Sequence, residues 1–123
     1  MTQGTISQER EVLVTLNVVG VNRTQQTIQG VLDTGYTGFL TLPAATIRLL
    51  NLHLVGTRPV ILGDNSEVLL KEFFAIVVLN GRERGVLVLQ SESIPLLGMR
   101  LLQGHRITLD VVPGGPVTIE PLS

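Results

Sequence analysis

Turn signals cut this chain into short apolar segments, and this feature limits its fold more than any other. Runs rich in Val, Ile and Leu alternate with Gly, Asn, Asp and Pro, which are strand-forming and turn-forming residues respectively. No strand–helix–strand repeat is present, so a parallel sheet covered by crossover helices is not expected. The pattern predicts an all-β domain, closed or sandwich-like, with few and short helices.

The expected strands follow from these runs. Two turns are especially clear: Gly63 to Ser66 separates two strands, and Asn80-Gly81 is a strong signal for a tight hairpin. Alternation places one set of side chains of the first strand on a common face. We expect strands at residues 11–19, 27–32, 39–42, 58–62, 67–79, 85–89, 106–112 and 117–120.

Two short helices are expected. One follows Pro43, a residue that the first helical position tolerates, and runs to Leu50. The other covers residues 99–103 and is closed by Gly104. The buried side of the first helix is expected to carry Ile47, Leu49, Leu50 and Leu52, and one face of the strand at 106–112 is expected to carry Ile107, Leu109 and Val111.

Size and composition fit one domain over residues 1–123. The chain is 44% hydrophobic and 15% charged, enough to build a core, and its net charge of −1 predicts no nucleic-acid or membrane partner. It has no cysteine, no apolar run long enough to span a membrane and a polar N-terminal segment, so a cytoplasmic protein is expected. His53 and His105 have no third ligand at a sensible spacing, so neither a metal nor another cofactor is expected.

One carboxylate stands out. Val31 and Leu32 lead a strand toward the interior, Asp33 ends it, and Thr34-Gly35 begins a sharp turn. An acid at the mouth of an apolar interior is costly unless it is hydrogen-bonded or shares a proton. Asp33 is therefore a candidate catalytic acid/base; the alternative is an acid that only satisfies backbone donors at a strand end.

Asp-Thr-Gly after two apolar residues resembles the catalytic triplet of the retropepsin-like single-domain aspartic proteases. A second motif supports the resemblance: Leu96-Leu97-Gly98 followed by Leu101-Leu102 is similar to the segment that passes beside the catalytic turn in that family and enters a short helix. The order of elements resembles the family over roughly residues 10–112. The resemblance implies a closed acid-protease barrel with one or two short helices.

Counting carboxylates then requires a second chain. Hydrolysis of a peptide by carboxylates needs two of them around one water molecule. The other aspartates, Asp64 and Asp110, lie in a turn and a strand without a matching context. A protease of this type is therefore expected to be a homodimer, with one Asp33 from each subunit on the two-fold axis.

The resemblance also implies roles for neighbouring residues. Thr34 would hydrogen-bond across the dimer axis, and Gly35 would allow the turn. Residues Gly63, Asp64 and Asn65 would form the tip of a flap that closes over an extended peptide or protein substrate. By the same resemblance, residues 117–120 would form part of the dimer interface.

The sequence departs from the retroviral pattern at three positions, two of which carry an ion pair in that pattern. Tyr36 and Thr37 stand where that pattern has Ala and an acid, and Met99 stands where it has an Arg that pairs with the acid. The aromatic residue after Asp-Thr-Gly is similar to prokaryotic members, and Tyr36 is expected in a substrate pocket or at the dimer interface. We expect Arg58 and Arg100 to be solvated.

Two functions remain open from the sequence. The first is a homodimeric aspartic endopeptidase that hydrolyses peptide bonds. The second is a non-catalytic protease-like module that dimerises or binds extended peptides, in which Asp33, Thr34 and Gly35 serve the interface alone.

Overall fold

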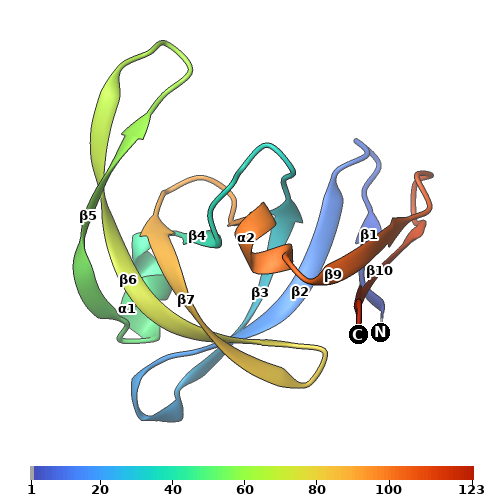
Figure 1. Ribbon diagram of the computed structural model, residues 1–123, viewed down its shortest axis with the longest axis horizontal. Coiled ribbons are helices and arrows are strands. Elements are labelled where there is room, and N and C mark those ends of the chain that lie inside the picture. Colours follow the sequence, from blue (N-terminus) through green and yellow to red (C-terminus); the bar gives the residue numbers. More distant parts are fainter. Residues whose placement is uncertain (1) are drawn as a thin grey trace.

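The computed structural model describes residues 2–123, and β-strands dominate it (Figure 1). Strands make up 55% of the chain and helices 11%, which confirms the all-β class. Among the described residues, no helix combines the length and apolar character needed to cross a membrane. The elements are β1 (Thr2–Ile6), β2 (Val12–Val19), the 3-10 turn η1 (Val21–Arg23), β3 (Gln25–Leu32), β4 (Leu40–Leu42), α1 (Ala44–Leu49), β5 (His53–Ile61), β6 (Glu67–Leu79), β7 (Arg82–Gln90), β8 (Leu96–Leu97), α2 (Met99–Leu102), β9 (His105–Leu109) and β10 (Pro116–Pro121).

The strands form one hydrogen-bonded sheet in the order β5-β6-β7-β4-β8-β3-β2-β1-β10-β9. Strand β2 also pairs with β6, so the pairing leads from β6 through β7, β4, β8 and β3 back to β2. These strands do not lie evenly around one axis, so we describe them as an all-β sheet and not as a closed barrel. The core inside this sheet is made mainly of buried Val, Leu and Ile side chains, together with Phe73 and Ala75.

Three hairpins are present between β2 and β7, two of them at the turns that the sequence predicts. Strands β2 and β3 pair antiparallel, and so do β5 with β6 and β6 with β7. In the turn between β6 and β7, Asn80 has φ 54° and Gly81 has φ 75°. Both values match the tight hairpin turn that the Asn-Gly pair favours. Strand β5 begins at His53, earlier than the sequence predicts.

Helix α1 starts after Pro43 as expected, and the carboxylate of Glu92 accepts a hydrogen bond from the Ala44 N–H at 2.9 Å. Ile47 and Leu50 are buried three positions apart, on one face of the helix. The prediction for Leu49 is wrong, because this side chain points away from that face and is 65% exposed.

Two further expectations need correction. Strand β1 was not expected from its polar sequence; it forms because its main chain pairs with β2 on one side and β10 on the other. Val111 does not belong to a strand, since β9 ends at Leu109 and the chain turns back through residues 112–115, which leaves Val111 exposed.

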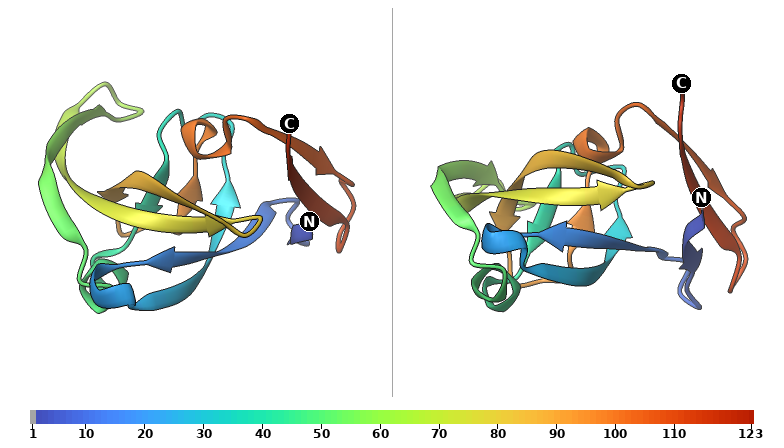
Figure 2. Two further views of the ribbon diagram at one scale, coloured as in Figure 1. Left: turned by 60° about the horizontal axis from the view of Figure 1, so that its bottom comes forward. Right: turned by 90° about the horizontal axis from the view of Figure 1, so that it is seen from below.

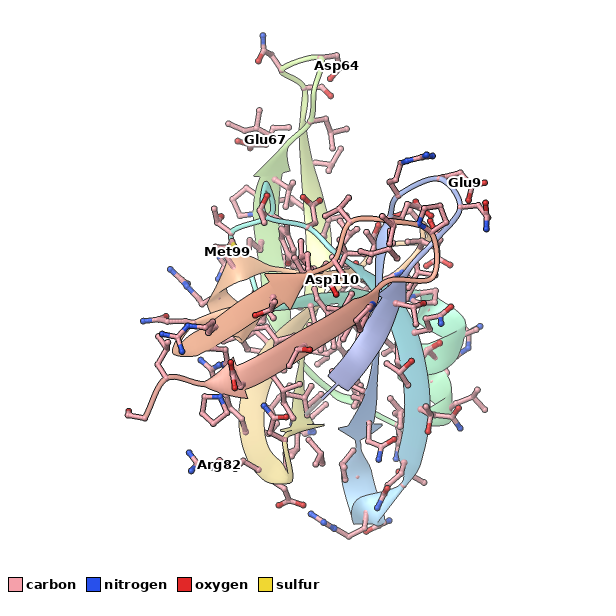
Figure 3. All side chains as sticks on the ribbon, turned by 90° about the vertical axis from the view of Figure 1, so that its right-hand side faces the viewer. Glu9, Asp64, Glu67, Arg82, Met99 and Asp110 are labelled. Atoms are coloured by element: carbon pink, nitrogen blue, oxygen red, sulfur yellow. The ribbon has the colours of Figure 1, made fainter. Side chains whose placement is uncertain are left out.

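The two ends of the sheet lie at opposite sides of the molecule. Strands β1, β9 and β10 lie together near both chain termini, whereas the β5–β6 hairpin projects on the other side (Figures 1 and 2). The tip of this hairpin, marked by Asp64, is far from Arg82 at the β6–β7 turn (Figure 3). The β3–β4 turn, which carries the Asp-Thr-Gly triplet, reaches the same end of the molecule as the hairpin tip.

Candidate active site

Asp33 lies directly after β3, a strand in the interior of the sheet. Parallel pairing of β3 with β8 places Leu32 beside Leu97, and the Asp33 N–H donates to the Leu97 carbonyl at 2.9 Å. The Gly35 N–H donates to Asp33 Oδ1 at 2.8 Å. Within the described residues, the second carboxylate oxygen, Oδ2, makes no hydrogen bond. The half-buried carboxylate is thus oriented through one oxygen and keeps the other available.

The second motif packs against this turn through its main chain. The Gly98 N–H donates to the Phe39 carbonyl at 2.9 Å, and the Met99 N–H donates to the Tyr36 carbonyl at 2.8 Å. A Cβ at Gly98 would lie 2.1 Å from the Gly38 carbonyl oxygen, so this approach requires glycine. The expectation that an apolar-Gly segment passes beside the acid-bearing turn and enters a short helix is confirmed.

Thr34 and Gly35 are exposed beside Asp33. No hydrogen bond of the Thr34 hydroxyl is found among residues 2–123. Thr34 borders a mostly apolar groove of about 370 Å³, whose other walls include Leu32, Met99 and Leu109. This groove runs from the acid-bearing turn to β9, the last strand of the sheet.

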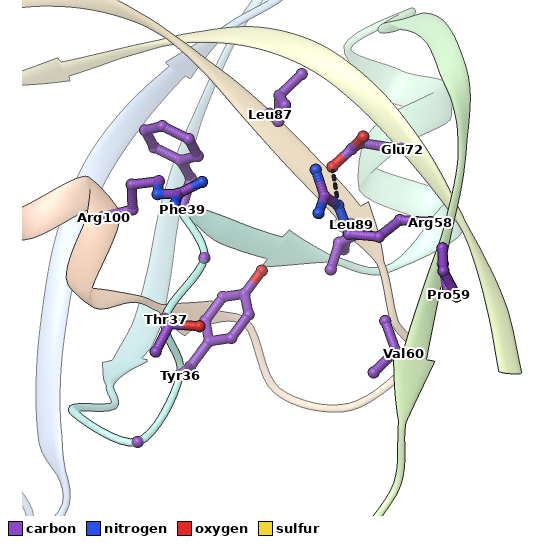
Figure 4. A pocket seen from close by; sticks show the side chains of 12 residues that line it. Tyr36, Thr37, Phe39, Arg58, Pro59, Val60, Glu72, Leu87, Leu89 and Arg100 are labelled. Carbon is purple, nitrogen blue, oxygen red and sulfur yellow. Dashed lines mark hydrogen bonds and ion pairs between the residues drawn. The ribbon is translucent and has the colours of Figure 1, made fainter. Parts of the chain in front are cut away.

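Tyr36 lies on the other side of the turn, in a cavity of about 350 Å³ between the turn and the arm of the β5–β6 hairpin (Figure 4). Burial raises the pKa of the half-buried phenol above 10.0, the negative charge of Glu72 raises it further, and Arg58 opposes both effects. The cavity is lined by Gly35, Tyr36, Thr37, Gly38, Phe39, Arg58, Pro59, Val60, Glu72, Leu87, Leu89 and Arg100.

The predicted flap-tip residues Gly63, Asp64 and Asn65 do not line this cavity. They are exposed at the tip of the hairpin, where Asn65 adopts a φ of 67°. Asp64 Oδ1 accepts hydrogen bonds from the Ser66 hydroxyl at 2.5 Å and the Ser66 N–H at 2.9 Å, and these bonds lower the pKa of Asp64. Across this cavity the turn therefore faces the arm of the hairpin, at residues 58–60, and not its tip.

The sequence did not reveal the ion pair that forms one wall of the cavity. Arg58 Nε donates to Glu72 Oε2 at 2.8 Å, and the Glu72 side chain is 11% exposed. The two residues are diagonal neighbours on β5 and β6, since Glu72 lies opposite Gly56. Opposite charges at diagonal positions of a hairpin are the signal that could have found this pair.

Arg84 makes a second connection near the acid-bearing turn. It lies close to the β6–β7 turn, and its Nη1 donates to the Leu101 carbonyl at 3.0 Å. Its guanidinium also lies 5.4 Å from the centre of the Phe39 ring. Arg84 thus connects β7 to α2 and to the end of the acid-bearing turn.

The other aspartates lie in different parts of the fold. Asp64 is at the hairpin tip and Asp110 follows β9 (Figure 3). In the part of the chain that the structure describes, no three His, Cys, Asp or Glu side chains come together in a way that could hold a metal ion. Strand β10 pairs with β1 and β9, so it offers no free edge to a second copy, whereas β9 has one.

Comparison with known proteins assigns no family to this arrangement. No protein-family model matches the chain, and no curated protein shows significant similarity to it.

Proposed function

We propose that this protein is a homodimeric aspartic endopeptidase of the retropepsin-like type. The supporting observation is the setting of Asp33: a half-buried carboxylate after an interior strand, oriented by the Gly35 N–H, beside a cavity under an extended hairpin. In this proposal the curved sheet corresponds to the closed acid-protease barrel, and the protein acts in the cytoplasm without a cofactor.

The chemistry requires two Asp33 carboxylates around one water molecule. One, ionised, accepts a proton from the water as it attacks the peptide carbonyl carbon. The other, protonated, donates to the carbonyl oxygen, and a proton then passes to the leaving nitrogen as the C–N bond breaks. Two carboxylates at such short range share a proton and titrate as a pair.

The arrangement of the chain supports a second copy as the source of the second carboxylate. Asp64 and Asp110 lie elsewhere, and Glu72 is engaged by Arg58. The exposed Thr34 and the apolar groove beside it form a surface that a second copy would cover on association. The free edge of β9 adjoins the same surface, and we place the dimer contact there, with residues 117–120 behind it.

The substrate in this proposal is an extended peptide. It lies between the acid-bearing turn and the β5–β6 hairpin, where β5 is the terminal strand of the sheet and has a free edge. Main-chain hydrogen bonds to such an edge hold a peptide of any sequence, and side-chain pockets set the preference.

The test is Asp33→Asn, with Asp110→Asn as the matched control. Asp110 is exposed, so its loss removes one aspartate without touching the proposed site. We expect Asp33→Asn to abolish cleavage of an unfolded protein substrate while size and circular dichroism stay unchanged, and Asp110→Asn to cleave normally. Full cleavage by Asp33→Asn would overturn the mechanism.

The alternative, a non-catalytic module, has a different outcome in the same experiment. It predicts a wild-type protein that dimerises or binds extended peptides but releases no cleavage product at acid or neutral pH. The exposed Thr34 and Gly35 are compatible with such an interface, so product analysis by mass spectrometry decides between the two functions.

A further inference from the structure

The cavity beside Tyr36 carries more positive charge than a pocket for an apolar side chain needs. Two arginines line it, Arg58 from β5 and Arg100 from α2, and they approach it from opposite sides (Figure 4). Glu72 is the acid among the lining residues. Since Glu72 is paired with Arg58, the charge of Arg100 is left without a counterion in the cavity.

The ion pair also orients Arg58. A guanidinium carries five N–H donors, and here Nε is held by Glu72 at 2.8 Å. The nitrogens of the other end, Nη1 and Nη2, are directed toward the interior of the cavity (Figure 4). In the described part of the chain, Arg58 has no ion-pair partner other than Glu72, and Arg100 has none.

Tyr36 adds a neutral donor between the two cations. Its hydroxyl points into the cavity from the side of the acid-bearing turn (Figure 4). A phenol is protonated at neutral pH, and burial raises the pKa of Tyr36 further, so the hydroxyl can donate a hydrogen bond to an anion there.

Apart from Thr37, the remaining residues that line the cavity carry no polar side chain, and they fit the stem of a side chain. Phe39, Leu87, Leu89 and Val60 surround the space between the arginines, and its volume of about 350 Å³ accommodates one side chain of an extended peptide. Apolar walls with convergent donors are typical of a site that recognises a charged group on a short aliphatic stem. Charge-assisted hydrogen bonds from Arg to carboxylate are among the stronger polar contacts in proteins.

We propose that this cavity is a specificity subsite that binds an acidic side chain, Asp or Glu, of the peptide substrate close to the bond that is cleaved. The proposal rests on the proposed function where it calls the bound peptide a substrate. The preference for an acidic side chain does not depend on cleavage. The cavity lies next to the proposed catalytic carboxylate, because Gly35 lines the cavity and also belongs to the turn that orients Asp33.

The binding test uses a mixture of decapeptides with degenerate positions, passed over immobilised Asp33→Asn protein, with retained peptides sequenced. We expect Asp and Glu to be enriched about tenfold over Asn and Gln at one position, the ratio for a charge-assisted contact in a partly exposed site. Adding Arg100→Gln to this protein should remove most of the preference, and raising the salt concentration should weaken it.

Two further variants control for structure and for charge. Arg58→Gln together with Glu72→Gln removes the ion pair without leaving a buried unpaired carboxylate, and it should also lose the preference. Arg48→Gln removes an equal charge from the exposed face of α1, outside this cavity, and should retain it. Equal retention of acidic, amide and apolar residues, or an acid preference that survives both cavity variants, would overturn the subsite.

Cleavage by the wild-type protein separates the two proposals. Digestion of a proteome-derived peptide mixture should give products with Asp or Glu within three residues of the cleaved bond. Cleavage without that enrichment overturns the subsite and leaves the endopeptidase standing. Acid-selective binding without cleavage overturns the endopeptidase and leaves the cavity as a binding site for acidic peptides.

Discussion

At the scale of single residues, Tyr36 is a spectroscopic probe of the cavity. It is the single tyrosine of the chain, so the absorbance of tyrosinate reports on this side chain alone. Burial and Glu72 raise its pKa above 10.0, so we expect the folded protein to titrate at higher pH than the urea-unfolded chain. Glu72→Gln should lower this pKa by removing a negative charge, and Arg58→Gln should raise it.

The same shift has a consequence for stability. An acid whose pKa is raised on folding favours the folded state below the pKa of the unfolded chain, and this contribution is lost as pH rises through the folded pKa. Urea midpoints should therefore decrease above about pH 10, the ordinary tyrosine value. A Tyr36 that titrates at or below that value in the folded protein would contradict the burial of its hydroxyl.

Residue identity predicted part of the site and missed the rest for a physical reason. Asp33 and Gly98 could be found because each is required locally, one by a turn and one by a close approach of two backbones. Arg58 and Arg100 are exposed, as the sequence predicts, but their place beside the cavity has no local signal apart from the diagonal pairing of Arg58 with Glu72. Their position becomes defined only when β5 and α2 are packed around the same space.

At the scale of elements, the start of α2 fixes the shape of the acid-bearing turn. A Cβ at Gly98 would meet the Gly38 carbonyl oxygen at 2.1 Å and the Tyr36 ring at 2.6 Å, and the backbone atom cannot move aside alone. We expect Gly98→Ala to destabilise the protein by roughly 1–3 kcal/mol, as overpacking of a tight contact does, measured by urea unfolding.

The control for this prediction lies in the hairpin tip. At Gly63 an added Cβ would meet nothing within 4 Å, so Gly63→Ala should leave the urea midpoint nearly unchanged. An unchanged urea midpoint for Gly98→Ala would mean that the second motif does not pack against the turn as described.

Elements were predictable where turn chemistry and alternation agree. The hairpins β5–β6 and β6–β7 follow from apolar strands on both sides of a clear turn. Strand β1 was missed because its pairing comes from main-chain groups of β2 and β10, and a polar sequence gives no sign of it. Leu49 was misplaced because a short helix buries one narrow face, and its position lies outside that face.

At the scale of the whole molecule, the sequence predicts the all-β class, while the distribution of the strands around the core depends on long-range pairing. The pairing of β2 with β6 joins segments that lie far apart in the chain, and no local signal encodes it. The same limit applies to assembly: the free edge of β9 and the groove beside Thr34 become visible only once the sheet order is known.

A dimer that shares its active site makes a quantitative prediction for mixed subunits. If each site needs one Asp33 from each copy, a dimer with a single Asp33→Asn subunit has lost one of its two carboxylates and is inactive. After exchange of equal amounts of wild-type and Asp33→Asn protein, about a quarter of the dimers keep both carboxylates by random pairing. Cleavage should then fall to that level, with the total protein concentration held constant.

A chain that carried a complete site would behave differently, because activity would fall only to the wild-type fraction of about one half. The matched mixture with Asp110→Asn should lose nothing, which separates dilution of the dimer from loss of a carboxylate. The specific activity of the wild-type protein should also fall on dilution below the dissociation constant of the dimer, since separated subunits have one carboxylate each. Linear dependence on the wild-type fraction, or activity independent of dilution, would place both catalytic groups in one chain and exclude the shared site.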